Sequence, residues 1–122
     1  MNPEPTKRID NRLTQFSISV CLLLEHLPHT LGIRRMGDQL LRSATSIGAN
    51  YEEATAAESR ADFIHKLQIS LKESRETCYW LRVLGGCLTS QSDHLQNVLD
   101  EACQIRAMLT KAVSTAKSRM TT

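Results

Sequence analysis

The chain of 122 residues is long enough for one domain with its own hydrophobic core, without metal or disulfide support. Hydrophobic residues make up 41%, charged residues 23% and aromatic residues only 4% of the sequence, which argues against disorder and favours helix over strand. Fifteen Lys and Arg oppose thirteen Asp and Glu, and the formal charge of +2 is too small to require a nucleic-acid partner, although it is compatible with one.

The first predicted helix covers residues 6–27. Its apolar residues recur at alternating steps of four and three, which is the spacing of one buried helical face. These residues are Ile9, Leu13, Phe16, Val20, Leu23 and Leu27. Pro28 ends the helix, because proline cannot donate a backbone hydrogen bond and disfavours helical geometry at the preceding residue.

A second helix is predicted over residues 33–57. Its apolar residues form two neighbouring stripes, Met36, Leu40, Ile47 and Ala54 on one, and Leu41, Ala44, Gly48 and Tyr51 on the other. A glycine inside a helix costs about 1 kcal/mol relative to alanine. We therefore expect another helix to approach closely over Ala44 and Gly48.

Ser59 followed three residues later by Asp62 resembles a capping box, which predicts the start of a third helix over residues 60–84. Gly85 and Gly86 are expected to end that helix with left-handed backbone geometry. Its buried side is expected to carry Phe63, Leu67, Leu71, Ser74, Cys78, Leu81 and Leu84.

The fourth predicted helix covers residues 92–119, beginning near Ser90 or Ser92. Its inner face is expected to carry Leu95, Val98 or Leu99, Ala102, Ile105, Leu109 and Ala112. Four helices with short connections predict an all-α fold, an antiparallel up-down-up-down four-helix bundle that forms a single domain over residues 1–122. Additional apolar residues predict self-association through helix faces that include Leu22, Leu24 or Trp80.

The sequence contains no motif for catalysis, for a cofactor or for a metal ion. The four cysteines lack Cys-x-x-Cys spacing and are interpreted as buried free thiols, which fits a reducing compartment. No Gly-x-Ser-x-Gly, phosphate-binding glycine loop or repeated Glu-x-x-His occurs. Residues 1–10 do not resemble a signal peptide, and no apolar stretch is long enough to span a membrane. We expect a cytoplasmic protein that is not an enzyme and has no small-molecule substrate.

A polar stripe borders the apolar face of the second helix. Arg42, Ser46 and Asn50 are four residues apart and Glu53 follows after three, so the four share one side of the helix. One interpretation is a hydrogen-bonded network that fixes helix register or a subunit contact, with Glu76 as a candidate partner of Arg42. The other is a ligand or RNA contact, because an arginine can bind phosphate bidentately.

Basic residues give the strongest nucleic-acid signal. Candidate RNA contacts are Arg34, Arg35, Arg106, Lys111, Lys117 and Arg119, and the last helix has no acidic residue after Glu101. The alternative is a solvated surface, because the acidic residues Glu52, Glu53, Glu58 and Asp62 are expected at the same end of the bundle as the end of the fourth helix.

The pattern Arg-x-x-x-Ser-Ile-x-x-Asn-x-x-Glu is met by Arg42, Ser46, Ile47, Asn50 and Glu53, and is followed by Ser59 and Phe63. With this pattern the chain resembles the bacterial four-helix bundle family named for reading frames in 23S ribosomal RNA intervening sequences. The resemblance implies a homopentamer. It also implies a relation to a more basic branch, whose members resemble RNA-binding accessory partners of reverse transcriptases.

We therefore expect a pentameric binding or scaffold module with structured RNA as its partner. A protein–protein adaptor that uses the outer helix faces is the main alternative. An enzyme with a site at subunit boundaries is the third.

Overall fold

The computed structural model describes residues 5–90 and 92–120. It consists of α1 (Pro5–Glu25), α2 (Leu31–Thr55), α3 (Arg60–Cys87) and α4 (Asp93–Met120). The prediction of an all-α chain with four helices is confirmed over these residues, none of which forms a strand. The predicted domain also includes positions 1–4, 91 and 121–122, which lie outside the described residues.

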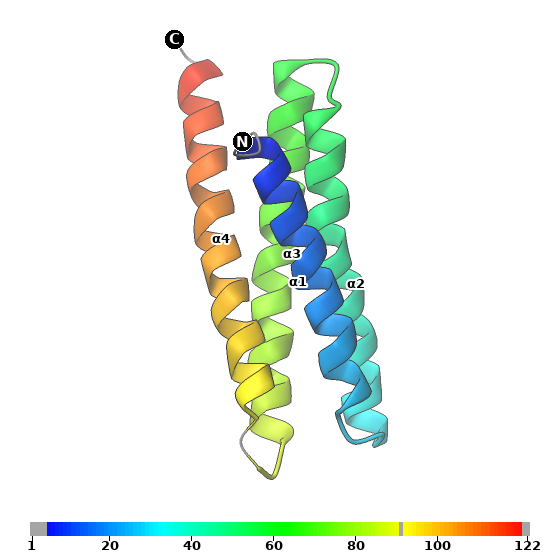
Figure 1. Ribbon diagram of the computed structural model, residues 1–122. Coiled ribbons are helices and arrows are strands. Elements are labelled where there is room, and N and C mark those ends of the chain that lie inside the picture. The colour runs from blue at the N-terminus through cyan, green and yellow to red at the C-terminus, as the bar shows by residue number, and fades with distance from the viewer. Residues whose placement is uncertain (1–4, 91, 121–122) are drawn as a thin grey trace.

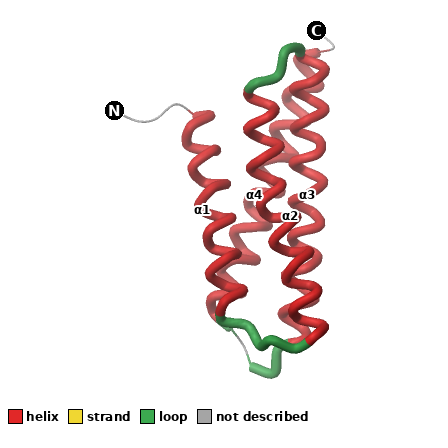
Figure 2. Tube along the Cα trace, turned by 90° about the vertical axis from the view of Figure 1, so that its right-hand side faces the viewer, coloured by secondary structure: helices red, strands yellow, loops and turns green. Residues whose placement is uncertain are grey.

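The helices reverse direction from one to the next, as the colour order in Figure 1 shows. In Figure 2 the α1–α2 and α3–α4 connections lie at one end and the α2–α3 connection lies at the other. Among the described residues, α1 contacts α2 and α4, while α3 contacts α2 and α4. The helices α1 and α3 therefore lie on one diagonal of the bundle, separated by α2 and α4.

Helix α1 ends at Glu25, two residues before the predicted end. The backbone N–H groups of His26 and Leu27 donate to carbonyls three residues back, at 3.1 and 3.3 Å, which tightens the chain before Pro28. Leu27 is nevertheless buried, as expected. Helix α2 begins earlier than predicted, at Leu31, and ends at Thr55 instead of residue 57.

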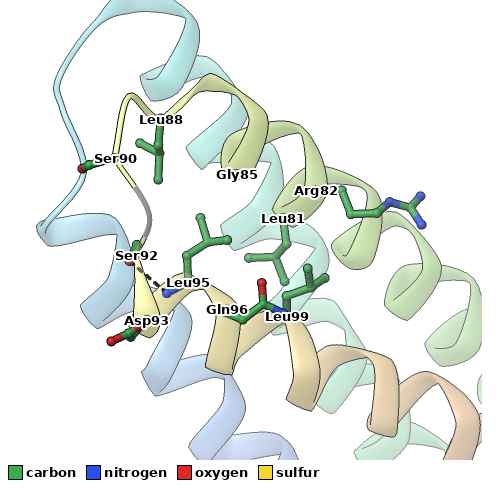
Figure 3. A pocket seen from close by; sticks show the side chains of 10 residues that line it. All are labelled: Leu81, Arg82, Gly85, Leu88, Ser90, Ser92, Asp93, Leu95, Gln96 and Leu99. Atoms are coloured by element: carbon green, nitrogen blue, oxygen red, sulfur yellow. Dashed lines mark hydrogen bonds between the residues drawn. The ribbon is translucent and has the colours of Figure 1, made fainter.

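The capping prediction at Ser59 is confirmed, because its Oγ accepts a hydrogen bond from the backbone N–H of Asp62 at 3.0 Å. The predicted end of α3 at Gly85 and Gly86 is wrong, since the helix continues to Cys87 and no described glycine has a positive φ. Packing explains the difference. A Cβ atom at Gly85 would lie 3.4 Å from the Leu95 side chain, so the glycine makes room for α4 beside a continuing helix (Figure 3).

The core contains most of the residues expected from the apolar spacing. Buried as predicted are Leu13, Phe16, Val20, Leu23, Leu27, Leu40, Ala44, Ile47, Tyr51, Ala54, Leu67, Leu71, Ser74, Cys78, Leu81, Leu84, Leu95, Val98, Ala102, Ile105 and Leu109. Near helix ends the buried side shifts by one residue, so that Ile64 and Val113 are buried while Phe63 and Ala112 are half-buried. An α-helix drifts against a strict seven-residue repeat, which accounts for this shift.

The prediction of buried cysteines holds for Cys78 alone. Cys21, Cys87 and Cys103 are exposed. Cys21 follows the buried Val20, and Cys103 follows the buried Ala102. One residue corresponds to about 100° around a helix, which turns these two side chains out of the core.

The contact between α2 and α3 is built from small hydroxyl side chains. Ser43, Ser70, Ser74 and Thr77 have no exposed surface. The Oγ of Ser70 donates to the Ile47 carbonyl across the contact at 2.8 Å, and Thr77 Oγ1 lies 2.9 Å from Ser43 Oγ. Small side chains with hydrogen-bonded hydroxyls let two helix backbones approach closely without leaving polar groups unpaired.

The expected close approach at Gly48 is an ordinary contact with α1, since a Cβ there would lie 3.5 Å from the Leu13 Cβ. The tighter point is Gly37. A Cβ at that position would lie 3.1 Å from the Leu24 side chain, so α1 packs directly on the α2 backbone there.

Candidate functional site

Arg42 joins α2 to α3 through two carboxylates. Its guanidinium pairs with Glu73 at 3.2 Å and with Glu76, and its Nε donates to Gln39 at 3.2 Å. The indole N–H of Trp80 donates to the same Glu76 carboxylate at 3.1 Å. Glu76 is therefore in contact with Arg42, as the sequence suggested, and Glu73 is a second partner that the sequence did not indicate.

The other members of the polar stripe do not join this cluster. The Asn50 side-chain amide donates to the carbonyl and the hydroxyl of Ser46, both at 2.9 Å. Both residues belong to α2, so this interaction does not connect α2 to another helix. The Glu53 side chain is exposed and forms no hydrogen bond or ion pair with the residues that the structure describes, whereas its backbone carbonyl accepts from the Ala56 N–H at 3.3 Å. The stripe is consequently split into an interhelical ion cluster and a local intrahelical pair.

Replacing Arg42 by alanine should lower the free energy of unfolding by about 1 kcal/mol, because Glu73 and Glu76 would then face each other without a cation. Water screens part of the interaction, since the Arg42 side chain is 48% exposed. Urea unfolding followed by circular dichroism measures the change. Glu53→Ala serves as the matched control and should change stability by less than about 0.5 kcal/mol. Equal losses in both variants would contradict a structural role for Arg42.

The three apolar residues proposed for self-association differ in exposure. Leu22 is 47% exposed on α1, whereas Leu24 is half-buried against the core. Trp80 is also half-buried and lies edge-on to Tyr79, with ring centroids 5.1 Å apart. Leu22 and Trp80 lie on α1 and α3, which do not contact each other.

A different apolar surface lies on the outer side of α1. Residues 13–24 contain no charged side chain, although α1 is exposed along one side. Ile18 is 44% exposed and lies one turn before Leu22, with Gln15 and Cys21 exposed beside them. We name Gln15, Ile18, Cys21 and Leu22 the α1 outer face. Ile18 was not singled out from the sequence, although its spacing of four from Leu22 indicates it.

The six predicted basic contacts do not form one patch. Arg34 and Arg35 lie in the first turns of α2, at the end of the bundle where α4 begins. Lys117 and Arg119 lie in the last turn of α4, at the opposite end (Figure 1). A helix of 28 residues is about 42 Å long, so these two pairs are far apart. Lys111 is exposed and Arg106 half-buried between them.

Arg75 and Arg82 of α3 flank Cys78 in the sequence, and Arg106 of α4 acts on the same Cys78 thiol. Cys78 of α3 and Cys103 of α4 lie at the same position along the bundle axis, because their side chains interact. Arg75 lies three residues before Cys78 and Arg106 three residues after Cys103. Since the two helices run in opposite directions, Arg75 and Arg106 lie at the same level.

Arg82 lies one turn from Cys78 on the other side of that level. Arg82 and Arg106 both act on the Cys78 thiol, where their positive charges oppose the rise of its pKa. Arg82 and Asp93 both line a hollow of about 410 Å³ between α3 and α4. The Arg82 guanidinium points away from this hollow (Figure 3). We name Arg75, Arg82 and Arg106 the arginine seam.

The arginine seam has no acidic partner among the described residues. Glu73 and Glu76 lie on the side of α3 that faces α2, where both pair with Arg42. On α4, Glu101 is turned towards α1, where Arg12 binds both of its oxygens at 2.8 and 2.7 Å. The hydrogen bonds with Glu101 raise the pKa of Arg12. The nearby Asp100 accepts a hydrogen bond from Gln96 at 3.0 Å.

The sequence contained a partial signal for the seam. Arg75 and Arg82 are seven residues apart, which is two helical turns, and the exposed Lys72 lies one turn earlier on α3. Their meeting with Arg106 could not be predicted, because it depends on the register between two helices.

Two further properties concern the described residues. None of their His, Cys, Asp and Glu side chains gather in groups of three or more that could hold a metal ion. No described helix combines the length and the apolar character needed to cross a membrane.

The chain is similar to known proteins over most of its length. The family model described as 23S rRNA-intervening sequence protein matches residues 8–111. A crystal structure of a protein with unknown function from the S23 ribosomal protein family, from Bacteroides thetaiotaomicron VPI-5482, is similar with a TM-score of 0.78 and 33% sequence identity. The alignment covers 89% of this chain and 97% of that chain. Curated protein sequences give no match.

Proposed function

Because this chain belongs to the family of 23S rRNA-intervening sequence proteins, we propose that it is a non-enzymatic, self-associating module that binds structured RNA through the arginine seam. The family name refers to ribosomal RNA sequences, and the relative of known structure is named for a ribosomal protein family. Both names support RNA as the partner. The four free cysteines support a reducing, cytoplasmic location.

The observation that carries the proposal is the lack of acidic partners beside the arginine seam. Arginine presents several N–H donors in a planar fork that matches phosphate oxygens, and it stays charged at all physiological pH values. Arg75 and Arg82 are exposed, and Arg106 is half-buried at the same helix contact. The seam therefore has the charge and the spacing to follow a phosphate backbone. The exposed Tyr79, four residues after Arg75 and three before Arg82, lies on the same side of α3.

A fluorescence titration of the purified protein with structured ribosomal RNA fragments, at low and physiological salt, tests this function. Binding through phosphates should weaken steeply as salt rises, because the protein displaces condensed counterions. Absence of binding at low salt would contradict the RNA proposal and favour the protein–protein adaptor. A flat salt dependence would also contradict it, since apolar contacts respond little to counterions.

The α1 outer face supports self-association. Ile18 and Leu22 expose apolar surface on the same side of α1, and no charge interrupts it from residue 13 to residue 24. A charge-free helix face with apolar residues one turn apart is typical of contacts between subunits. A ring of five copies is the form that the family resemblance implies. Such a ring would present five arginine seams, and multivalent contact would strengthen RNA binding.

Replacing Ile18 and Leu22 together by glutamate should raise the dissociation constant for self-association by at least about 10-fold, because two charges would have to be buried in the contact. Light scattering after size-exclusion chromatography measures the effect against a chain mass of 13.7 kDa. Leu31→Glu is the control, since Leu31 is 71% exposed at the start of α2. A wild-type protein that is monomeric at micromolar concentration would contradict self-association.

A further inference from the structure

Two thiols from different helices meet at the level of the arginine seam. Cys78 of α3 is 1% exposed, and Cys103 of α4 is exposed next to it. Burial raises the pKa of Cys78 to about 11, and interaction with the Cys103 side chain contributes to the same rise. The Cys103 side chain acts directly on the Cys78 thiol, so the two thiols are neighbours where α3 and α4 pack together.

The helix register supports this pairing independently. Gly85 of α3 packs against Leu95 of α4, as Figure 3 shows near the end of the bundle. Cys78 lies seven residues before Gly85, and Cys103 lies eight residues after Leu95. In two helices of opposite direction, equal steps away from a contact arrive at the same level, and the difference of one residue here corresponds to about 1.5 Å. The register therefore brings Cys78 and Cys103 opposite each other, two turns from the Gly85 contact.

The spacing of packed helices permits a bond between such thiols. Helix axes in contact are about 8 to 10 Å apart and Cα atoms lie about 2.3 Å from each axis. Cα atoms that face each other are thus about 3.5 to 5.5 Å apart, and somewhat more at the rim of the contact. A disulfide spans Cα distances of roughly 4.4 to 6.8 Å.

The two thiols differ in access to solvent. A small oxidant reaches the exposed Cys103 first, whereas the buried Cys78 remains protonated at neutral pH because of its raised pKa. This is the arrangement of an exposed thiol with a second, resolving thiol beside it. Cys21 lies nine residues after Arg12, which binds Glu101 and Gln104 of α4, and Cys87 lies nine residues after Cys78. Each is therefore about 13 Å along the bundle from Cys103, and neither is placed to resolve it.

We propose that Cys103 and Cys78 form an oxidation site for small hydroperoxides that closes into a disulfide between α3 and α4. The Cys103 thiolate attacks the O–O bond of the hydroperoxide, which breaks to give a sulfenic acid and, after protonation, water or an alcohol. The Cys78 sulfur then attacks the Cys103 sulfur. The S–S bond forms, the S–O bond breaks, and hydroxide leaves with the Cys78 proton as water. The two thiols lose two electrons and the hydroperoxide gains them.

Treatment of the reduced full-length protein with hydrogen peroxide tests the site. The expected result is the loss of two of the four thiols, a mass decrease of about 2 Da and a peptide that links Cys78 to Cys103. Reduction with dithiothreitol should restore all four thiols. No loss of thiols, or a disulfide between other cysteines or between chains, would overturn the proposal.

Two variants separate the roles of the thiols. Cys103→Ser changes an exposed side chain and should abolish the disulfide, leaving Cys78 unmodified. Cys78→Ala should leave a sulfenic acid at Cys103 that dimedone traps. The double variant Cys21→Ser, Cys87→Ser should form the disulfide as the wild type does. A trapped sulfenic acid in the folded wild-type protein, in place of the disulfide, would show that Cys78 does not resolve Cys103.

Discussion

Replacing Arg75, Arg82 and Arg106 together by glutamine is expected to weaken the binding of structured RNA by about 100-fold at physiological salt. Each guanidinium that meets a phosphate displaces counterions and contributes roughly 0.7 to 0.9 to the slope of log K against log salt. Three substitutions should therefore reduce the magnitude of that slope by about 2 to 3. Fluorescence titrations over a series of salt concentrations measure both quantities.

The matched control removes the same charge from the ends of the bundle. In the triple variant Arg34→Gln, Arg35→Gln, Lys117→Gln, affinity should fall by less than about 10-fold, because these side chains lie far from the seam. A larger loss here than in the seam variant would mean that the ends bind the RNA. The seam residues have no ion pair with the described residues, so their replacement should leave the melting temperature nearly unchanged.

A leucine in place of Ser70 should lower the free energy of unfolding by about 3 kcal/mol. Ser70 has no exposed surface, and its hydroxyl donates to the Ile47 carbonyl at 2.8 Å. A larger side chain has to push α2 and α3 apart, and it also removes that hydrogen bond. For a domain of this size the melting temperature should fall by roughly 10 °C. Thermal and urea unfolding measure the change.

The control for this prediction is Ser70→Ala, which removes the hydroxyl without adding volume and should cost about 1 kcal/mol. Leucine and alanine variants of equal stability would contradict a close contact between α2 and α3 at this position. The comparison thus separates the effect of the hydrogen bond from the effect of the distance between the helices.

Local signals predicted much of the helical structure. The alternation of steps of three and four located the core residues, and Ser59 with Asp62 marked the start of α3 to the residue. The family resemblance carried by residues 42–63 is confirmed by the family model over residues 8–111. These signals depend only on neighbours along the chain, which is why one sequence was enough.

The wrong predictions concern positions whose structure depends on contact with a second helix. Gly85 and Gly86 looked like a helix end, but α4 packs on α3 there and the helix continues to Cys87. The spacing of the polar stripe placed Arg42 correctly at the border of the apolar face, yet it could not indicate Glu73, which lies on α3. Asn50 was expected in the same network and instead binds Ser46 within α2.

The candidate nucleic-acid residues illustrate the same limit. Counting basic residues along α4 selected Arg106, Lys111, Lys117 and Arg119, and of these only Arg106 belongs to the arginine seam. The arginine seam combines α3 and α4, so it depends on which residues of two antiparallel helices lie at the same level. That register follows from packing contacts such as Gly85 with Leu95, which no periodicity within one helix contains.

Ion pairs offset the charge of the α3 carboxylates but leave that of the arginine seam. Arg42 binds the carboxylates of Glu73 and Glu76 on the α2 side of α3, whereas the arginine seam has no ion pair with the described residues. A molecule with a net charge of only +2 can therefore rotate in the field of a polyanion before contact, so that the α4 side leads. Orientation during the encounter would increase the fraction of productive collisions, with no need for the strongly basic composition of many nucleic-acid-binding domains.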